Sequence, residues 1–157
     1  MKIKDLIKDD IQMSGWWVND YITSNLDYEK DEFEQVINLN EVLRNVYIAT
    51  TFLDDVNNGG IDYYYDCSAG KFRNYLYDVF EKIGSKEVCK IVKDGNEIIK
   101  KIENRIGDEI TDNIQETTDL ESKKLSALTK KMNNLNSNDE LYELISNYVN
   151  QNLDVEI

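Results

Sequence analysis

Carboxylates are the side chains whose number and spacing in this sequence could do chemistry. Asp54 is followed directly by Asp55, and Asp62 is followed by Asp66. Such pairs could supply a general acid and base, or oxygen ligands for a hard cation such as Mg²⁺. The chain has no His, which removes the usual neutral-pH acid-base group and the commonest zinc ligand. No spacing matches a calcium loop, so we expect no enzyme activity, no metal and no cofactor.

The densest acidic run lies between residues 108 and 121 and contains no base. Its members are Asp108, Glu109, Asp112, Glu116, Asp119 and Glu121. If this stretch is one helix, the carboxylates at 108, 112, 116 and 119 project within about 80° of each other. Their density is roughly one charge per 3.5 Å of axis, close to the ~3.4 Å between phosphates of a DNA strand. The sequence therefore predicts an anionic stripe for a basic partner, the alternative being a solvated face.

A second acidic segment covers residues 31–66, which hold one base and eight acids. Asp54, Asp55, Asp62 and Asp66 are its candidate protein-binding residues. The whole chain has 157 residues and a net charge of -13, which repels nucleic acids and anionic membranes and favours a basic partner. Acidity that serves solubility alone is the competing explanation.

Secretion and membrane insertion are not indicated. The first residues lack the apolar stretch of a signal peptide, and no run approaches the ~20 apolar residues of a membrane span. Cys67 and Cys89 are isolated, so we expect reduced thiols rather than a disulfide framework. A cytoplasmic protein without direct nucleic-acid or membrane contact is the simplest interpretation.

Helical periodicity dominates the chain. It predicts an all-α fold, a single compact domain over residues 1–157 with about seven to eight helices around a buried central helix. We expect a short helix over residues 3–11 that ends near Ser14 and Gly15, and the central helix over residues 31–56. Further helices are expected over residues 71–83, over 86–106 after an N-cap at Ser85, and after a capping box that begins at Ser137.

Glycines and polar residues after the central helix form a structural motif made of Asn58, Gly59, Gly60, Ser68 and Gly70. The Asn and Gly residues are expected to end the central helix, the glycines by adopting positive φ, and Ser68 could cap the helix near Lys71. For the intervening Tyr63, Tyr64 and Tyr65 we expect packing in the core, with the rim of an interface as the alternative.

The segment from Asn58 to Gly70, followed by a helix ending at Gly84, resembles a family of acidic, all-helical bacterial DNA-mimic proteins. The likeness covers roughly residues 36–152, although Ile61 and Cys67 depart from the family pattern. The resemblance implies a non-catalytic protein that occupies the DNA-contacting surface of a basic partner, such as a helix-turn-helix regulator. An immunity protein or antitoxin against a basic toxin is the alternative, and Trp16, Trp17 and the tyrosines offer apolar surface for a homodimer.

Overall fold

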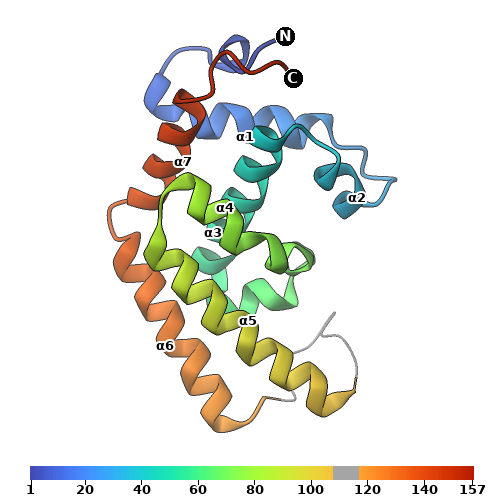
Figure 1. The fold of residues 1–157 in the computed structure, drawn as a ribbon, viewed down its shortest axis with the longest axis vertical. Helices are drawn as coiled ribbons and strands as arrows, with labels where there is room; N and C mark the ends of the chain where they lie inside the picture. Colours follow the sequence, from blue (N-terminus) through green and yellow to red (C-terminus); the bar gives the residue numbers. More distant parts are fainter. Residues whose placement is uncertain (108–116) are drawn as a thin grey trace.

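The computed structural model describes residues 1–107 and 117–157, and this part of the chain is helical with no β-strand (Figure 1). It contains the α-helices α1 (Ser14–Asn25), α2 (Glu32–Ile37), α3 (Glu41–Asp66), α4 (Leu76–Ile83), α5 (Lys86–Ile106), α6 (Asp119–Leu135) and α7 (Glu140–Asn150). Three 3-10 helices are η1 (Ile3–Leu6), η2 (Ile11–Met13) and η3 (Ser68–Tyr75). The all-α prediction is confirmed. No helix in these ranges is long and apolar enough to cross a bilayer.

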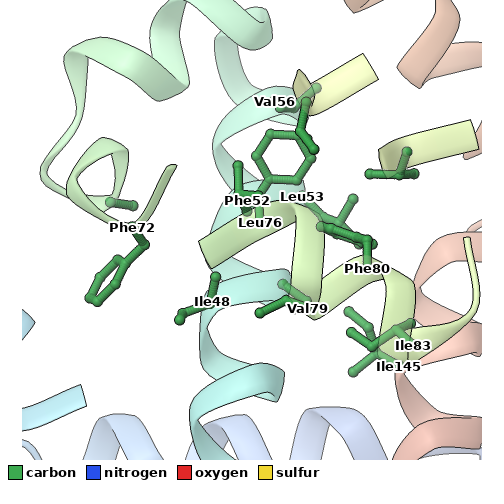
Figure 2. Close-up of a cluster of buried hydrophobic side chains, with 14 of the residues drawn as sticks. Ile48, Phe52, Leu53, Val56, Phe72, Leu76, Val79, Phe80, Ile83 and Ile145 are labelled. Carbon is green, nitrogen blue, oxygen red and sulfur yellow. The ribbon is translucent and has the colours of Figure 1, made fainter. Parts of the chain in front are cut away.

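Helix α3 is the central helix, as predicted, and it packs against α1, α4, α6, α7 and η3. Its Phe52 ring meets the Tyr64 ring edge to face, with centroids 4.9 Å apart, and the Phe80 ring of α4 at 5.6 Å. Figure 2 shows this cluster, in which Ile48, Leu53 and neighbouring apolar side chains surround the aromatic rings. Burial of these large rings away from water is the main stabilising contribution of the core.

The predicted helix over residues 31–56 is wrong at its start, whereas its predicted end coincides with a break in α3. The predicted span is divided in two, because α2 stops at Ile37 and Asn40 caps α3 by accepting a hydrogen bond from the Val42 amide at 2.8 Å. At the other end, the predicted stop at residues 57–60 is confirmed as an interruption at Gly60, and the unpredicted feature is a second helical segment that follows directly across a kink. Gly60 has φ 91°, yet the helix resumes at Ile61 because the Ile61 amide donates to the Thr129 hydroxyl of α6 at 3.0 Å.

The N-terminal helix over residues 3–11 is also wrong, since η1 and η2 occupy this region as separate short turns. Ser14 and Gly15 begin α1 instead of ending a helix. Their role is a close contact with α7: the Ser14 hydroxyl donates to the Ser146 carbonyl and the Gly15 amide donates to the Ser146 hydroxyl, both at 3.1 Å. A Cβ on Gly15 would lie 3.0 Å from Ile145 Cγ2, so the residue must be small.

The helix-end predictions have mixed outcomes. Ser85 caps α5 by accepting from the Val88 amide at 3.3 Å, and α4 ends at left-handed Gly84, both as predicted. Ser68 makes no capping bond and instead begins η3. The box predicted at Ser137 is wrong, because Asn136 Oδ1 accepts the Leu141 amide hydrogen bond at 3.0 Å. The start of a helix is set by which nearby oxygen atom accepts the hydrogen bonds of the first amides, which have no acceptor within the helix.

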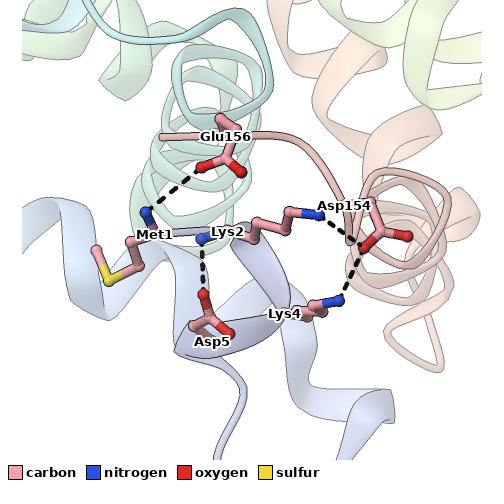
Figure 3. Close-up of polar contacts among 6 residues, drawn as sticks. All are labelled: Met1, Lys2, Lys4, Asp5, Asp154 and Glu156. Carbon is pink, nitrogen blue, oxygen red and sulfur yellow. Dashed lines mark hydrogen bonds and ion pairs between the residues drawn. The ribbon is translucent and has the colours of Figure 1, made fainter.

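The first and last residues of the chain lie side by side (Figures 1 and 3). The Ile3 amide donates to the Val155 carbonyl at 3.1 Å, and the Ile157 amide donates to the Met1 carbonyl at 2.9 Å. Figure 3 shows the ion pairs above them, in which Lys4 lies 2.9 Å from Asp154. Both ends of the chain are thus fastened at one end of the helical body.

Candidate protein-binding surface

The predicted stripe is only partly within the described residues. Asp108, Glu109, Asp112 and Glu116 lie outside them. Asp119 is exposed and is the first residue of α6. The premise of one continuous helix through residue 121 is wrong, because Thr118 is extended at φ -73°, ψ 160° and acts as the N-cap of α6. A helical projection therefore cannot place Asp119 on one face with the earlier carboxylates.

Glu121, the last acid of that run, is neutralised within the protein. Its carboxylate accepts two hydrogen bonds from the Arg105 guanidinium, at 2.7 and 2.9 Å, and one from the Thr118 amide at 2.9 Å. The guanidinium and then the amide lower the pKa of Glu121 to about 2. This carboxylate fastens the start of α6 to the end of α5, and it is not available to a partner.

All four candidates of the second segment lie on α3, two on either side of the Gly60 kink. Asp54, Asp62 and Asp66 are exposed, whereas Asp55 is half-buried. Burial raises the pKa of the Cys67 thiol, and the negative charges of Asp55 and Asp66 raise it further. Carboxylates from both sides of the kink therefore act on the same sulfur atom.

Tyrosine hydroxyl groups fix two carboxylates, one on α3 and one on α2. The Tyr142 hydroxyl of α7 donates to Asp54 Oδ1 at 2.7 Å and accepts from Asn57 Nδ2 at 3.0 Å. The Tyr47 hydroxyl donates to Glu32 Oε1 of α2 at 3.0 Å. Burial, followed by the neighbouring carboxylates, raises the pKa of both phenols. The two hydroxyls therefore stay protonated and remain donors.

Glu32 joins Asp54 and Asp55 in one cluster, which sequence reasoning missed. Burial raises the pKa of Asp55 to about 6, and the charges of Asp54 and Glu32 contribute in that order. A signal was present in the sequence, since residues 27–34 hold five acids and one base. What the sequence lacked was the packing of α2 against α3. We call Glu32, Asp54, Asp55 and Asp62 the acidic surface.

The acidic surface keeps its negative charge. Among residues 1–107 and 117–157, the ion pairs found do not include any of its four carboxylates. Lys30 pairs with Asp27 and Lys82 pairs with Glu41, so neither of these two bases neutralises the acidic surface. In the same described ranges no three His, Cys, Asp or Glu side chains are placed so that they could hold one metal ion.

Charge is unevenly divided between the elements. Residues 1–66 hold 5 bases and 14 acids, a net of -9, whereas residues 67–107 hold 9 bases and 6 acids, a net of +3. Helix α6 adds four bases and two acids, a net of +2. Residues 136–157, which include α7, hold five acids and no base, a net of -5. Within the described residues the excess of acid therefore belongs to residues 1–66 and 136–157, and the acidic surface is the part of it that lies on α2 and α3.

The glycine motif is architectural, for reasons that differ from the prediction. Gly60 alone among the three motif glycines has positive φ. A Cβ on Gly59 would lie 2.5 Å from Tyr63 Cγ, and one on Gly70 would lie 2.9 Å from the Tyr65 carbonyl oxygen. Of the tyrosines, Tyr64 and Tyr65 are core residues as expected, while Tyr63 is 45% exposed. Asn58 is exposed on the outer side of α3.

Comparison with known proteins gives one match. A family model described as DMP19-like protein matches residues 37–152, which run from the end of α2 through α7. No curated protein and no solved structure matches the chain. The matched residues include the α3 portion of the acidic surface and exclude η1, η2 and α1.

Proposed function

The chain belongs to the DMP19-like protein family, and from this membership we propose that it is a non-catalytic DNA mimic. It binds the basic nucleic-acid-binding surface of a partner protein, such as a helix-turn-helix regulator, and blocks DNA binding. The single observation that carries the proposal is the acidic surface, whose carboxylates lie on packed helices and form no ion pair within the described residues.

Carboxylates can replace phosphates because both present oxygen acceptors to the same cationic side chains. A DNA-binding protein places Lys and Arg along the phosphate backbone, and those contacts position it without reading sequence. Asp54, Asp55 and Asp62 offer negative charges along α3, and Glu32 adds one from α2. Complementary charge of this kind favours both the correct partner and its orientation.

Tyrosine hydrogen bonds prepare two of these carboxylates for binding. Tyr142 holds Asp54 and Tyr47 holds Glu32, so these side chains lose less conformational freedom when a partner arrives. The cost of ordering side chains at an interface is about 0.5–1.5 kcal/mol for each flexible side chain. Two carboxylates that are already held in place therefore increase affinity, in addition to the electrostatic attraction that they provide.

Salt should weaken the interaction strongly. The attraction acts over a screening length of about 8 Å at physiological ionic strength, and the length falls to about 3 Å at 1 M salt. Association is expected to be fast at low salt because the field of the acidic surface steers a basic partner toward it.

The test is capture from the native cell, with DNA as competitor. Wild-type protein on a resin is compared with the triple variant Asp54→Asn, Asp55→Asn, Asp62→Asn. A matched control removes three exposed charges from α4 and α5, through Asp78→Asn, Glu81→Gln and Glu87→Gln. We expect a DNA-binding protein that duplex DNA displaces, about tenfold weaker capture by the triple variant, and no change with the control.

The outcomes separate the candidate functions. Release of DNA from a captured regulator in a gel-shift titration supports the mimic, whereas capture of a basic nuclease toxin assigns the immunity role. Equal weakening by the two triple variants would mean that binding depends on the total charge of the protein and not on the acidic surface. Capture that neither salt nor the triple variant reduces would refute the proposal.

A further inference from the structure

Three large apolar side chains are exposed together near the N-terminus. Ile11 is 53% exposed, Met13 47% and Trp16 52%. Met13 immediately precedes α1 and Trp16 follows three residues later, so the two lie on one side of its first turn. We call these three residues the N-terminal patch. Exposed apolar groups of this size mark interaction surfaces, and Trp is among the residues that contribute most to binding.

Acidic side chains border the N-terminal patch. Asp9 and Asp10 directly precede Ile11, and Asp20 follows Trp16 by one helical turn. Residues 5–20 hold four acids and a single base, Lys8. The Lys8 ammonium lies over the Trp17 ring, 5.0 Å from its centroid. An apolar centre with a negative border is complementary to an apolar residue flanked by Lys or Arg.

Polar side chains of α1 and α7 close to the patch in the chain or by contact have atoms without partners. Trp17 Nε1, Asn19 Oδ1 and Asn150 Oδ1 are buried without a hydrogen bond, and they are three of the five such atoms in the described residues. Asn150 reaches the patch itself, since its Nδ2 donates to the Ile11 carbonyl at 3.2 Å. Small rotations of these side chains would allow them to pair with a bound segment, which would relieve their missing hydrogen bonds.

We propose that the N-terminal patch is a second docking surface, for a basic amphipathic segment of a partner protein. An apolar side chain of that segment packs on Met13 and Trp16, and flanking Lys or Arg groups meet the acidic border. A second copy of this chain is disfavoured, since a two-fold interface would set acids against acids. The negative border likewise repels an anionic lipid surface.

This surface lies outside the acidic surface and outside the matched family region, which begins at residue 37. Docking here therefore adds a contact that the proposed mimicry does not need. A partner that uses both surfaces would gain affinity from two contacts at once.

Fluorescence reports on this patch directly, because Trp16 and Trp17 are the two tryptophans of the chain. The probe is a synthetic Lys/Leu amphipathic helix, compared with a Lys/Ser peptide of equal charge and a Glu/Leu helix. We expect a blue shift of emission with the Lys/Leu helix alone. The variant Ile11→Gln, Met13→Gln should bind about tenfold more weakly. The control is Leu120→Gln, which changes a 62%-exposed residue of α6 and should have no effect.

A second variant, Asp9→Asn with Asp20→Asn, tests the border and keeps the patch apolar; it should also weaken binding. Equal binding by the wild type and both variants would overturn the proposal, as would equal shifts with the Lys/Ser peptide. Concentration-dependent dimers that Ile11→Gln, Met13→Gln abolishes would assign the patch to a second copy instead. Binding should persist in the Asp54→Asn, Asp55→Asn, Asp62→Asn background, so failure here and failure of the mimic are distinguishable.

Discussion

Replacement of Asp55 by Asn should stabilise the protein at neutral pH, because the native fold holds this carboxyl in an unfavourable place. Burial and the charges of Asp54 and Glu32 raise the pKa of Asp55 from 3.8 to about 6. At about 1.4 kcal/mol per pH unit, the rise corresponds to about 3 kcal/mol. Asp55 is half-exposed and water screens its neighbours, so we reduce the expected gain to about 1 kcal/mol.

The size of this stabilisation depends on pH. The unfolded chain ionises Asp55 above pH 3.8 and the folded chain ionises it only near pH 6, so the folded state binds more protons between them. The free-energy cost of ionised Asp55 to the folded state is therefore complete above pH 6 and decreases as the pH falls toward 3.8. Asp55→Asn should gain about 1 kcal/mol at about pH 7.5 and about 0.2 kcal/mol at about pH 4.

Urea unfolding followed by circular dichroism at both pH values measures this difference. Asp78→Asn is the matched control, since it removes an exposed carboxylate of α4 and should change stability by less than about 0.5 kcal/mol. A variant that is less stable than wild type at neutral pH, or equally more stable at both pH values, would refute the assignment of Asp55 to a cluster with Asp54 and Glu32.

Three further predictions concern the partner, the kink and the caps. Capture of a basic partner should be stronger at about pH 7.5 than at about pH 5.5, because ionised Asp55 attracts cations, and a binding titration of Asp55→Asn should lose that pH dependence. Gly60→Ala should cost more than Gly84→Ala in thermal unfolding, about 3 against about 1 kcal/mol, since both have positive φ but a Cβ at Gly60 meets Asp62 and Thr129. Thr118→Ala should cost about 1 kcal/mol by losing a capping bond, while Ser137→Ala changes the unfolding midpoint little.

Local signals predicted the helices whose ends depend on adjacent residues. Gly84 and Ser85 separate α4 from α5 by a left-handed residue and a side-chain cap, and both are readable from sequence. The continuous apolar surface of the central helix was readable in the same way. These predictions succeeded because the groups that satisfy each other are within a few residues.

Distant contacts account for the failures. At the Gly60 kink the Ile61 amide is held by Thr129, 68 positions further along the chain, so a local rule predicts the break but not the helical segment that continues after it. Gly95 is small because Tyr65 lies against it: a Cβ would sit 2.5 Å from the phenol oxygen, which donates to Asn96 at 2.8 Å. Likewise, the cluster of Glu32 with Asp55 arises only when α2 packs beside α3. Charge runs along the chain indicate acidity, whereas a binding surface requires the tertiary arrangement.

The paired ends of the chain make backbone cyclisation practicable. Because the Ile157 amide already hydrogen-bonds to the Met1 carbonyl, a short peptide linker could join these residues without disturbing η1 or α7. Closure restricts the unfolded chain far more than the folded one, and the polymer relation for a loop of this length gives a gain of at most about 5 kcal/mol. The ring would also resist exopeptidases, and its helical body would be free of loose termini.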